Sequence, residues 1–131
     1  MKELSQIEVS FLLTSNEDYI DNITEKLSII PSKVRKKESY KVKEFARASW
    51  ELSTGLVNSR AISTQFDTIK QILCGKEELI NIISQEYNLE VFFIVTIHAV
   101  IGDGPEVVLP REIVKFASQI NAEIDFDIYY D

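Results

Sequence analysis

Residues 89–100, Leu-Glu-Val-Phe-Phe-Ile-Val-Thr-Ile-His-Ala-Val, form the strongest strand pattern in the chain. One face of this strand is entirely apolar, whereas the other has Phe92, Ile94 and Val100 among polar residues. Because apolar residues on both faces are typical of a strand inside a sheet, this stretch predicts a central strand. The turn-forming residues 102–105, Gly-Asp-Gly-Pro, follow it.

Three further segments alternate with a period of two, which predicts half-buried strands. They are residues 6–14, 48–54 and 123–130. In the last segment, the residues predicted to face inward are Ile124, Phe126, Ile128 and Tyr130.

Helical spacing of apolar residues predicts helices between these strands. A first helix is expected to begin at the capping residue Ser15, to bury Ile30 and to stop at Pro31. Residues 62–73 predict a second helix, residues 79–83 the apolar side of a third, and residues 110–120 a fourth.

The stretch from Lys33 to Arg47 contains seven of the 14 basic residues. It is interpreted as a basic connecting loop with room for a short strand near residues 40–45. It could form an anion or nucleic-acid site, but a solvated run of charge is the favoured interpretation.

These elements predict a single α+β domain over residues 1–131. Its expected architecture is a two-layer sandwich, with a mostly antiparallel four- to five-stranded sheet and three to four helices mainly on one face. If the short strand near residues 40–45 forms, the first part has a ferredoxin-like order.

The composition argues against several classes of function. The net charge of −7 argues against nucleic-acid binding, because an acidic surface repels phosphates. The apolar run 91–100 is too short for a membrane helix, which needs about 20 residues. One cysteine cannot form an internal disulfide, and together with the absence of a signal-peptide pattern it favours the cytoplasm.

The chain has few residues suited to catalysis or metal binding. His98 and Cys74 are its only histidine and cysteine, whereas a zinc site needs three or four such ligands. Cys74 is expected to be a buried, inert thiol, and no cofactor and no enzymatic activity are expected. Asp125 and Asp127 could bind a cation or act in acid–base catalysis, but on an outer strand they more often guard the edge.

Several short segments resemble one bacterial family. They include Trp50-Glu51-Leu52, the helix over residues 109–120 and the final stretch 122–129, Ala-Glu-Ile-Asp-Phe-Asp-Ile-Tyr. Together they are similar to the domain of unknown function number 4279. This resemblance implies a small bacterial protein, and we associate such proteins with toxin–immunity gene neighbourhoods.

The face of the sheet away from the helices is the candidate binding surface. It combines an apolar centre with an acidic rim, as protein interfaces do. Its predicted partner-binding residues are Phe92, Ile94, His98, Glu123, Asp125, Asp127 and Tyr129. The alternative is that another element covers this face, either residues 32–47 or a second helix layer.

Three functions remain open from the sequence. The first is an interaction module, most concretely an immunity protein that neutralises a basic toxin domain. The second is a small ligand-binding protein or enzyme with a pocket between sheet and helices, lined by His98, Trp50 and Tyr129. The third is a structural subunit that forms a homodimer through the same face.

Overall fold

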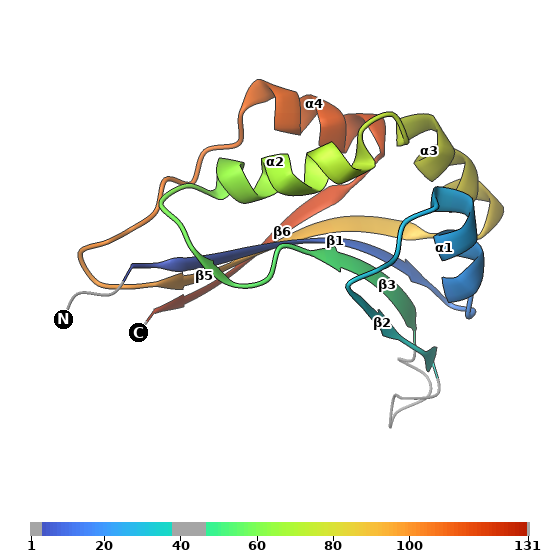
Figure 1. The fold of residues 1–131 in the computed structure, drawn as a ribbon, viewed down its shortest axis with the longest axis horizontal. Coiled ribbons are helices and arrows are strands. Elements are labelled where there is room, and N and C mark those ends of the chain that lie inside the picture. Colours follow the sequence, from blue (N-terminus) through green and yellow to red (C-terminus); the bar gives the residue numbers. More distant parts are fainter. Residues whose placement is uncertain (1–3, 38–46, 131) are drawn as a thin grey trace.

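The computed structural model of this chain describes residues 4–37 and 47–130. Its strands are β1 (Gln6–Ser15), β2 (Lys33–Arg35), β3 (Ala48–Ser53), β4 (Val57–Asn58), β5 (Glu90–Ala99) and β6 (Glu123–Tyr130). The helices in these ranges are α1 (Ile20–Leu27), α2 (Ile62–Leu73), α3 (Glu77–Glu86) and α4 (Arg111–Gln119). All four lie on one face of the sheet (Figure 1). The predicted two-layer α+β sandwich is therefore confirmed.

The strands form one sheet in the order β2-β3-β1-β5-β6, and β4 pairs with the start of β1. Neighbouring strands are antiparallel except β5 and β6, which run parallel and are joined by α4. As predicted, β5 lies inside the sheet. If the two-residue strand β4 is set aside with α4 and β6, and α2 and α3 are taken as one helical connection, the chain follows the β-α-β-β-α-β order of ferredoxin-like folds. The short second strand of this order is β2, whereas residues 40–45, where it was expected, lie outside the described residues.

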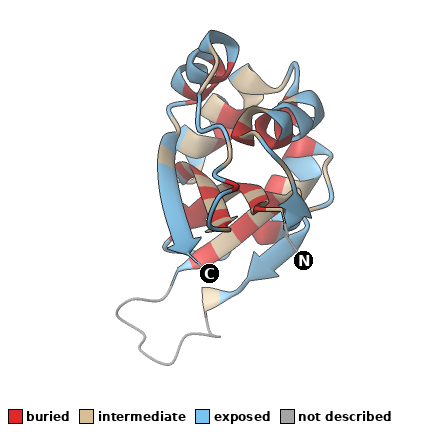
Figure 2. Ribbon diagram, turned by 90° about the vertical axis from the view of Figure 1, so that its left-hand side faces the viewer, coloured by how far each residue is buried: buried red, intermediate tan, exposed pale blue. Residues whose placement is uncertain are grey.

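The hydrophobic core lies between the sheet and the helices and centres on Phe93 of β5. The ring centroid of Phe93 is 5.5 Å from that of Phe11, 5.3 Å from that of Phe66 and 6.3 Å from that of Phe116. Along β3 and β5, every second residue faces this core, as the period of a strand requires. Figure 2 shows this alternation as red and tan bands.

Trp50 of β3 is completely buried in the same core. Its ring packs edge-on against Phe11, with 6.3 Å between the centroids. The indole N–H donates a hydrogen bond to the Thr24 hydroxyl of α1 at 2.9 Å. This bond satisfies the one polar group of the side chain and ties α1 to the sheet.

Helix α1 is shorter than predicted at both ends. Ser15 remains in β1, and its hydroxyl accepts the backbone N–H of Glu17 at 3.2 Å instead of capping a helix. The helix ends at Leu27 because Ser28 adopts a left-handed conformation with φ of 55°. Ile30 consequently lies beyond the helix and is 86% exposed, so its predicted burial is wrong.

The basic stretch is not a loop throughout. Residues 33–35 form β2, which pairs with β3 and aligns Val34 with Trp50. Strand β4, which aligns Val57 with Ile7, was not predicted, because two residues are too few to show an alternating pattern.

The inward side of β6 is buried only near its start. Ile124 packs against the core, whereas Phe126, Ile128 and Tyr130 are 40%, 46% and 80% exposed. Figure 1 shows why: the end of β6 extends past the helices towards the C-terminus. The prediction that these last three side chains are buried is therefore wrong.

The predicted turn at residues 102–105 is present, and Asp103 anchors it. Its carboxylate is buried and accepts the backbone N–H of Ser5 at 2.8 Å with one oxygen. The other oxygen accepts a hydrogen bond from the Arg60 guanidinium at 3.0 Å. The turn after β5 is thus tied both to the chain before β1 and to the segment before α2.

Candidate functional site

The face of the sheet opposite the helices, here called the open face, is formed mainly by β1, β5 and β6. No element in the described ranges covers it (Figure 1). Residues 33–37 lie at the far edge of the sheet, in and after β2, and the rest of the basic stretch to 46 is outside the described residues. The main open-face residues are Gln6, Glu8, Ser10, Leu12, Thr14, Glu90, Phe92, Ile94, Thr96, His98, Glu123, Asp125, Asp127 and Tyr129.

The strand register determines which open-face residues are neighbours. Phe92 lies between Leu12 of β1 and Glu123 of β6. Two residues further along β5, Ile94 lies between Ser10 and Asp125. Phe92, Ile94 and Leu12 are half-buried. They therefore form a short apolar strip beside the carboxylates of β6.

His98 forms an aromatic pair at one end of this strip. Its ring stacks on Tyr129 of β6 with 4.9 Å between centroids and 19° between planes. The structure thus brings the seven residues predicted for partner binding together on two neighbouring strands. The pair offers a flat aromatic surface with polar edges, which suits contact with another protein.

The acids of the open face differ in how they are satisfied. Glu8 accepts a hydrogen bond from Ser53, Glu51 accepts one from Ser10 at 3.1 Å, and Glu90 pairs with Arg47 at 2.6 Å.

The acids on β6 stand apart from these. Within the described part of the chain, Glu123, Asp125 and Asp127 have no ion-pair partner, and all three are exposed. Because they occur at every second residue, they form one acidic row along the outermost strand. This row remains available to cations from outside the protein.

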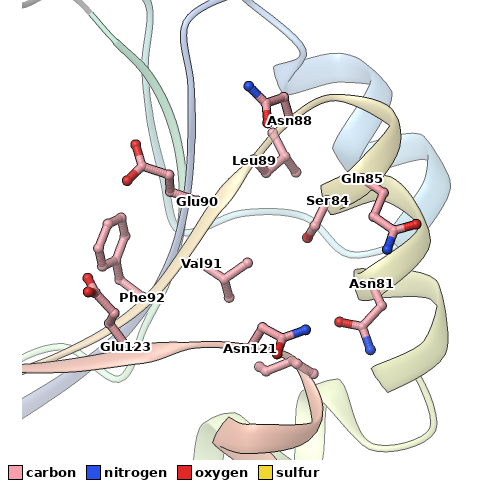
Figure 3. A pocket seen from close by; sticks show the side chains of 11 residues that line it. Asn81, Ser84, Gln85, Asn88, Leu89, Glu90, Val91, Phe92, Asn121 and Glu123 are labelled. Carbon is pink, nitrogen blue, oxygen red and sulfur yellow. The ribbon is translucent and has the colours of Figure 1, made fainter.

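A surface hollow of about 390 Å³ opens at the end of the sheet where β5 and β6 begin (Figure 3). The hollow exists because the first two residues of β5 have no partner in β6. The first pair between these strands is Phe92 with Glu123. Side-chain amides, one hydroxyl and two carboxylates surround it, and its apolar wall is formed by Leu89, Val91, Phe92 and Ile120. The polar side chains around it are Asn81, Ser84, Gln85, Asn88, Glu90, Asn121 and Glu123.

Several of these polar groups also have structural roles. Asn88 and Asn121 have φ of 54° and end helices α3 and α4 in the left-handed conformation that asparagine tolerates. The Asn81 amide donates to the Gln119 carbonyl at 2.7 Å, and the Ser84 hydroxyl donates to the Ile80 carbonyl. The sequence does not predict this hollow, because its lining comes from separate segments with no common spacing.

The pocket expected from His98, Trp50 and Tyr129 does not form. Trp50 is buried on the helix side of the sheet, whereas His98 and Tyr129 lie on the open face. Cys74 was predicted to be buried but is exposed, because it follows the last residue of α2. It lies in the helix layer, so it does not pair with His98.

Across residues 4–37 and 47–130, no group of three or more His, Cys, Asp or Glu side chains is arranged to hold a metal ion. In the same ranges, no helix has both the length and the apolar character needed to cross a bilayer.

The fold and its surface define a small α+β protein with a ferredoxin-like core, one added parallel strand and one acidic sheet face that no described element covers. Residues 5–131 match the sequence profile of the domain of unknown function DUF4279. The chain belongs to this family. Comparison with curated proteins and with solved structures gave no match.

Proposed function

We propose that this protein is a protein-binding module whose open face takes a basic partner, most concretely an immunity protein that neutralises a cognate bacterial toxin. The observation that carries the proposal is the acidic row of Glu123, Asp125 and Asp127 beside the apolar strip of Phe92 and Ile94. An apolar centre excludes water, and adjacent uncompensated charge selects the partner by its sign.

A basic toxin domain fits this surface in two respects. The net charge of −7 attracts a cationic partner at long range and raises the rate of encounter. An acidic surface can also occupy the positive groove in which a nuclease binds its substrate, so binding alone would inhibit it. In this proposal the protein acts without catalysis. A cytoplasmic location fits the single, unbridged cysteine.

Reversing charge on the acidic row should test the proposal. We expect Asp125→Lys combined with Asp127→Lys to weaken binding of the partner by about 100-fold or more, because both charges become repulsive. The partner is first captured from the native host with the wild-type protein and identified. Its affinity is then measured by calorimetry at low and high salt, and cells expressing the toxin are tested for protection.

A matched control reverses the charge of two aspartates in the helix layer instead of on the open face. Asp21→Lys combined with Asp67→Lys alters two exposed aspartates of α1 and α2. This control should retain the wild-type affinity within about threefold and should still protect cells, because it leaves the open face intact. Equal protection by the open-face variant, with both variants folded by circular dichroism, would contradict the proposal.

A second candidate function is binding of a small polar ligand in the hollow beside α3. Its volume of about 390 Å³ and its amide lining favour a ligand rich in hydroxyl or amide groups. Gln85→Leu should abolish shifts in the side-chain amide signals of Asn81 and Asn121 when such a ligand is added from a panel of sugars and amino acids. Gln71→Leu, an exposed glutamine of α2, is the control. A panel that moves none of these signals in the wild type would argue against this function.

A further inference from the structure

Strand β6 has one edge that pairs with β5 and one that pairs with nothing in the described part of the chain. In Figure 2 it is the mostly pale-blue strand that runs to the C-terminus at the side of the sheet. An eight-residue strand with a free edge presents a row of backbone N–H and C=O groups. Such a row can hydrogen-bond to an added strand.

The edge lacks most of the features that usually block such pairing. Residues 123–130, Glu-Ile-Asp-Phe-Asp-Ile-Tyr-Tyr, contain no proline, glycine or lysine. On the helix side of the sheet, Phe126 and Ile128 remain about half exposed. An added strand would cover them, because neighbouring strands lie only about 4.8 Å apart.

The side chains of β6 also specify the chemistry of the added strand. On the open face it would lie beside Glu123, Asp125 and Asp127, and on the helix side beside Phe126 and Ile128. Since side chains alternate between faces, the best match has a basic residue at every second position and apolar residues between them.

A second copy of the chain fits this edge poorly. Antiparallel pairing of β6 with β6 of another molecule would keep both open faces on the same side of a continuous sheet. When such a pair is centred on Phe126, Asp125 of one copy lies opposite Asp127 of the other, at the spacing of about 5 Å at which like charges are destabilising. The acidic row therefore opposes self-association and favours a basic strand.

We propose that β6 binds an extended segment of the protein partner by strand addition, and that this segment alternates Lys or Arg with apolar residues. The proposal rests on the proposed function of the open face and specifies how the partner is held. Backbone hydrogen bonds to the β6 edge would provide affinity, and the acidic row would select the sequence.

The probe is a capped eight-residue peptide that alternates lysine and valine, added to the isotope-labelled full chain. We expect the peptide carbonyls to accept hydrogen bonds from the backbone N–H groups on the unpaired edge of β6 and so to slow their hydrogen exchange by about tenfold or more at saturation. Two N-methylated versions of the peptide are compared. One is methylated at the odd-numbered residues and the other at the even-numbered residues, so each lacks the N–H donors along one edge. At least one of them should bind at least about tenfold more weakly, because it cannot pair with β6.

Three comparisons make the result decisive. A peptide of the same composition with lysines and valines in separate blocks should bind more weakly, because its charges do not follow the acidic row. Asp125→Asn combined with Asp127→Asn should weaken binding of the alternating peptide, whereas Asp21→Asn combined with Asp67→Asn should not. Unchanged binding of both N-methylated peptides, or no response of the β6 amides to the alternating peptide, would overturn strand addition.

These outcomes are separate from those that test the proposed function. If N-methylated and unmodified peptides bind equally, an open-face interface without strand addition still stands and is judged by the partner affinity of the charge-reversed variant. If that variant retains full partner affinity while the peptide still protects β6, the open-face proposal fails and the edge remains a peptide-binding site.

Discussion

Phe93→Ala is expected to lower the free energy of unfolding by about 3–5 kcal/mol, the range for a large aromatic residue removed from a core. Phe93 is 1% exposed and contacts three aromatic rings, Phe11 of β1, Phe66 of α2 and Phe116 of α4. Its removal leaves a cavity that sheet and helices cannot close without losing their other contacts. Urea titration followed by far-ultraviolet circular dichroism measures the loss.

The neighbouring residue supplies an internal control for this prediction. Phe92 has the same side chain, but it points to the open face and is only half-buried. Phe92→Ala should therefore lower the free energy of unfolding by only about 1 kcal/mol. In addition, Phe92→Ala should weaken partner binding, because its ring is at the centre of the apolar strip. Equal costs for the two variants would mean that the open face is covered by something in solution.

Asp103→Ala is expected to destabilise the protein by about 2–4 kcal/mol, because it removes a buried, charged hydrogen-bond acceptor. The substitution leaves the backbone N–H of Ser5 without the carboxylate that it contacts at 2.8 Å. It also releases the turn after β5 from Arg60. Thermal and urea unfolding should both report the loss, and amides near residues 5 and 100 should exchange faster with solvent.

Two milder variants separate the contributions within this network. Asp103→Asn keeps one oxygen acceptor and should cost about 1–2 kcal/mol. Arg60→Ala should cost less than about 1 kcal/mol, because the Arg60 side chain is 71% exposed and its ion pair is weakened by water. A larger loss for Arg60→Ala than for Asp103→Ala would show that the main role of Asp103 is not to hold Ser5.

The main strands and helices could be predicted because their patterns are local. In residues 89–100 the period of two and the apolar residues on both faces follow directly from burial within a sheet. The ends of α1 were missed because the spacing of its apolar residues does not encode them. The helix ends at Leu27, before the left-handed Ser28, and not at Pro31 as expected. The exposure of Ile128 was missed because it depends on how far the helix layer reaches, which no spacing within β6 encodes.

The open face could be predicted in part for the same reason. Asp125 and Asp127 share a face because they are two residues apart, whichever strand lies beside them. The stacking of Tyr129 on His98 could not be predicted, because it depends on the parallel register of β5 and β6. That register arises from the α4 crossover. The hollow beside α3 could not be predicted, because Asn81 and Asn121 meet only after the helices have packed.

The burial of Trp50 gives the protein an intrinsic optical reporter. It is the only tryptophan in the chain, and its indole is shielded from solvent and bonded to Thr24. Its emission should therefore be blue-shifted in the native state and should move to longer wavelength as the chain unfolds. Because the ring lies on the helix side of the sheet, a partner on the open face should leave that emission nearly unchanged. Fluorescence can thus monitor the integrity of the fold during a binding titration without a label.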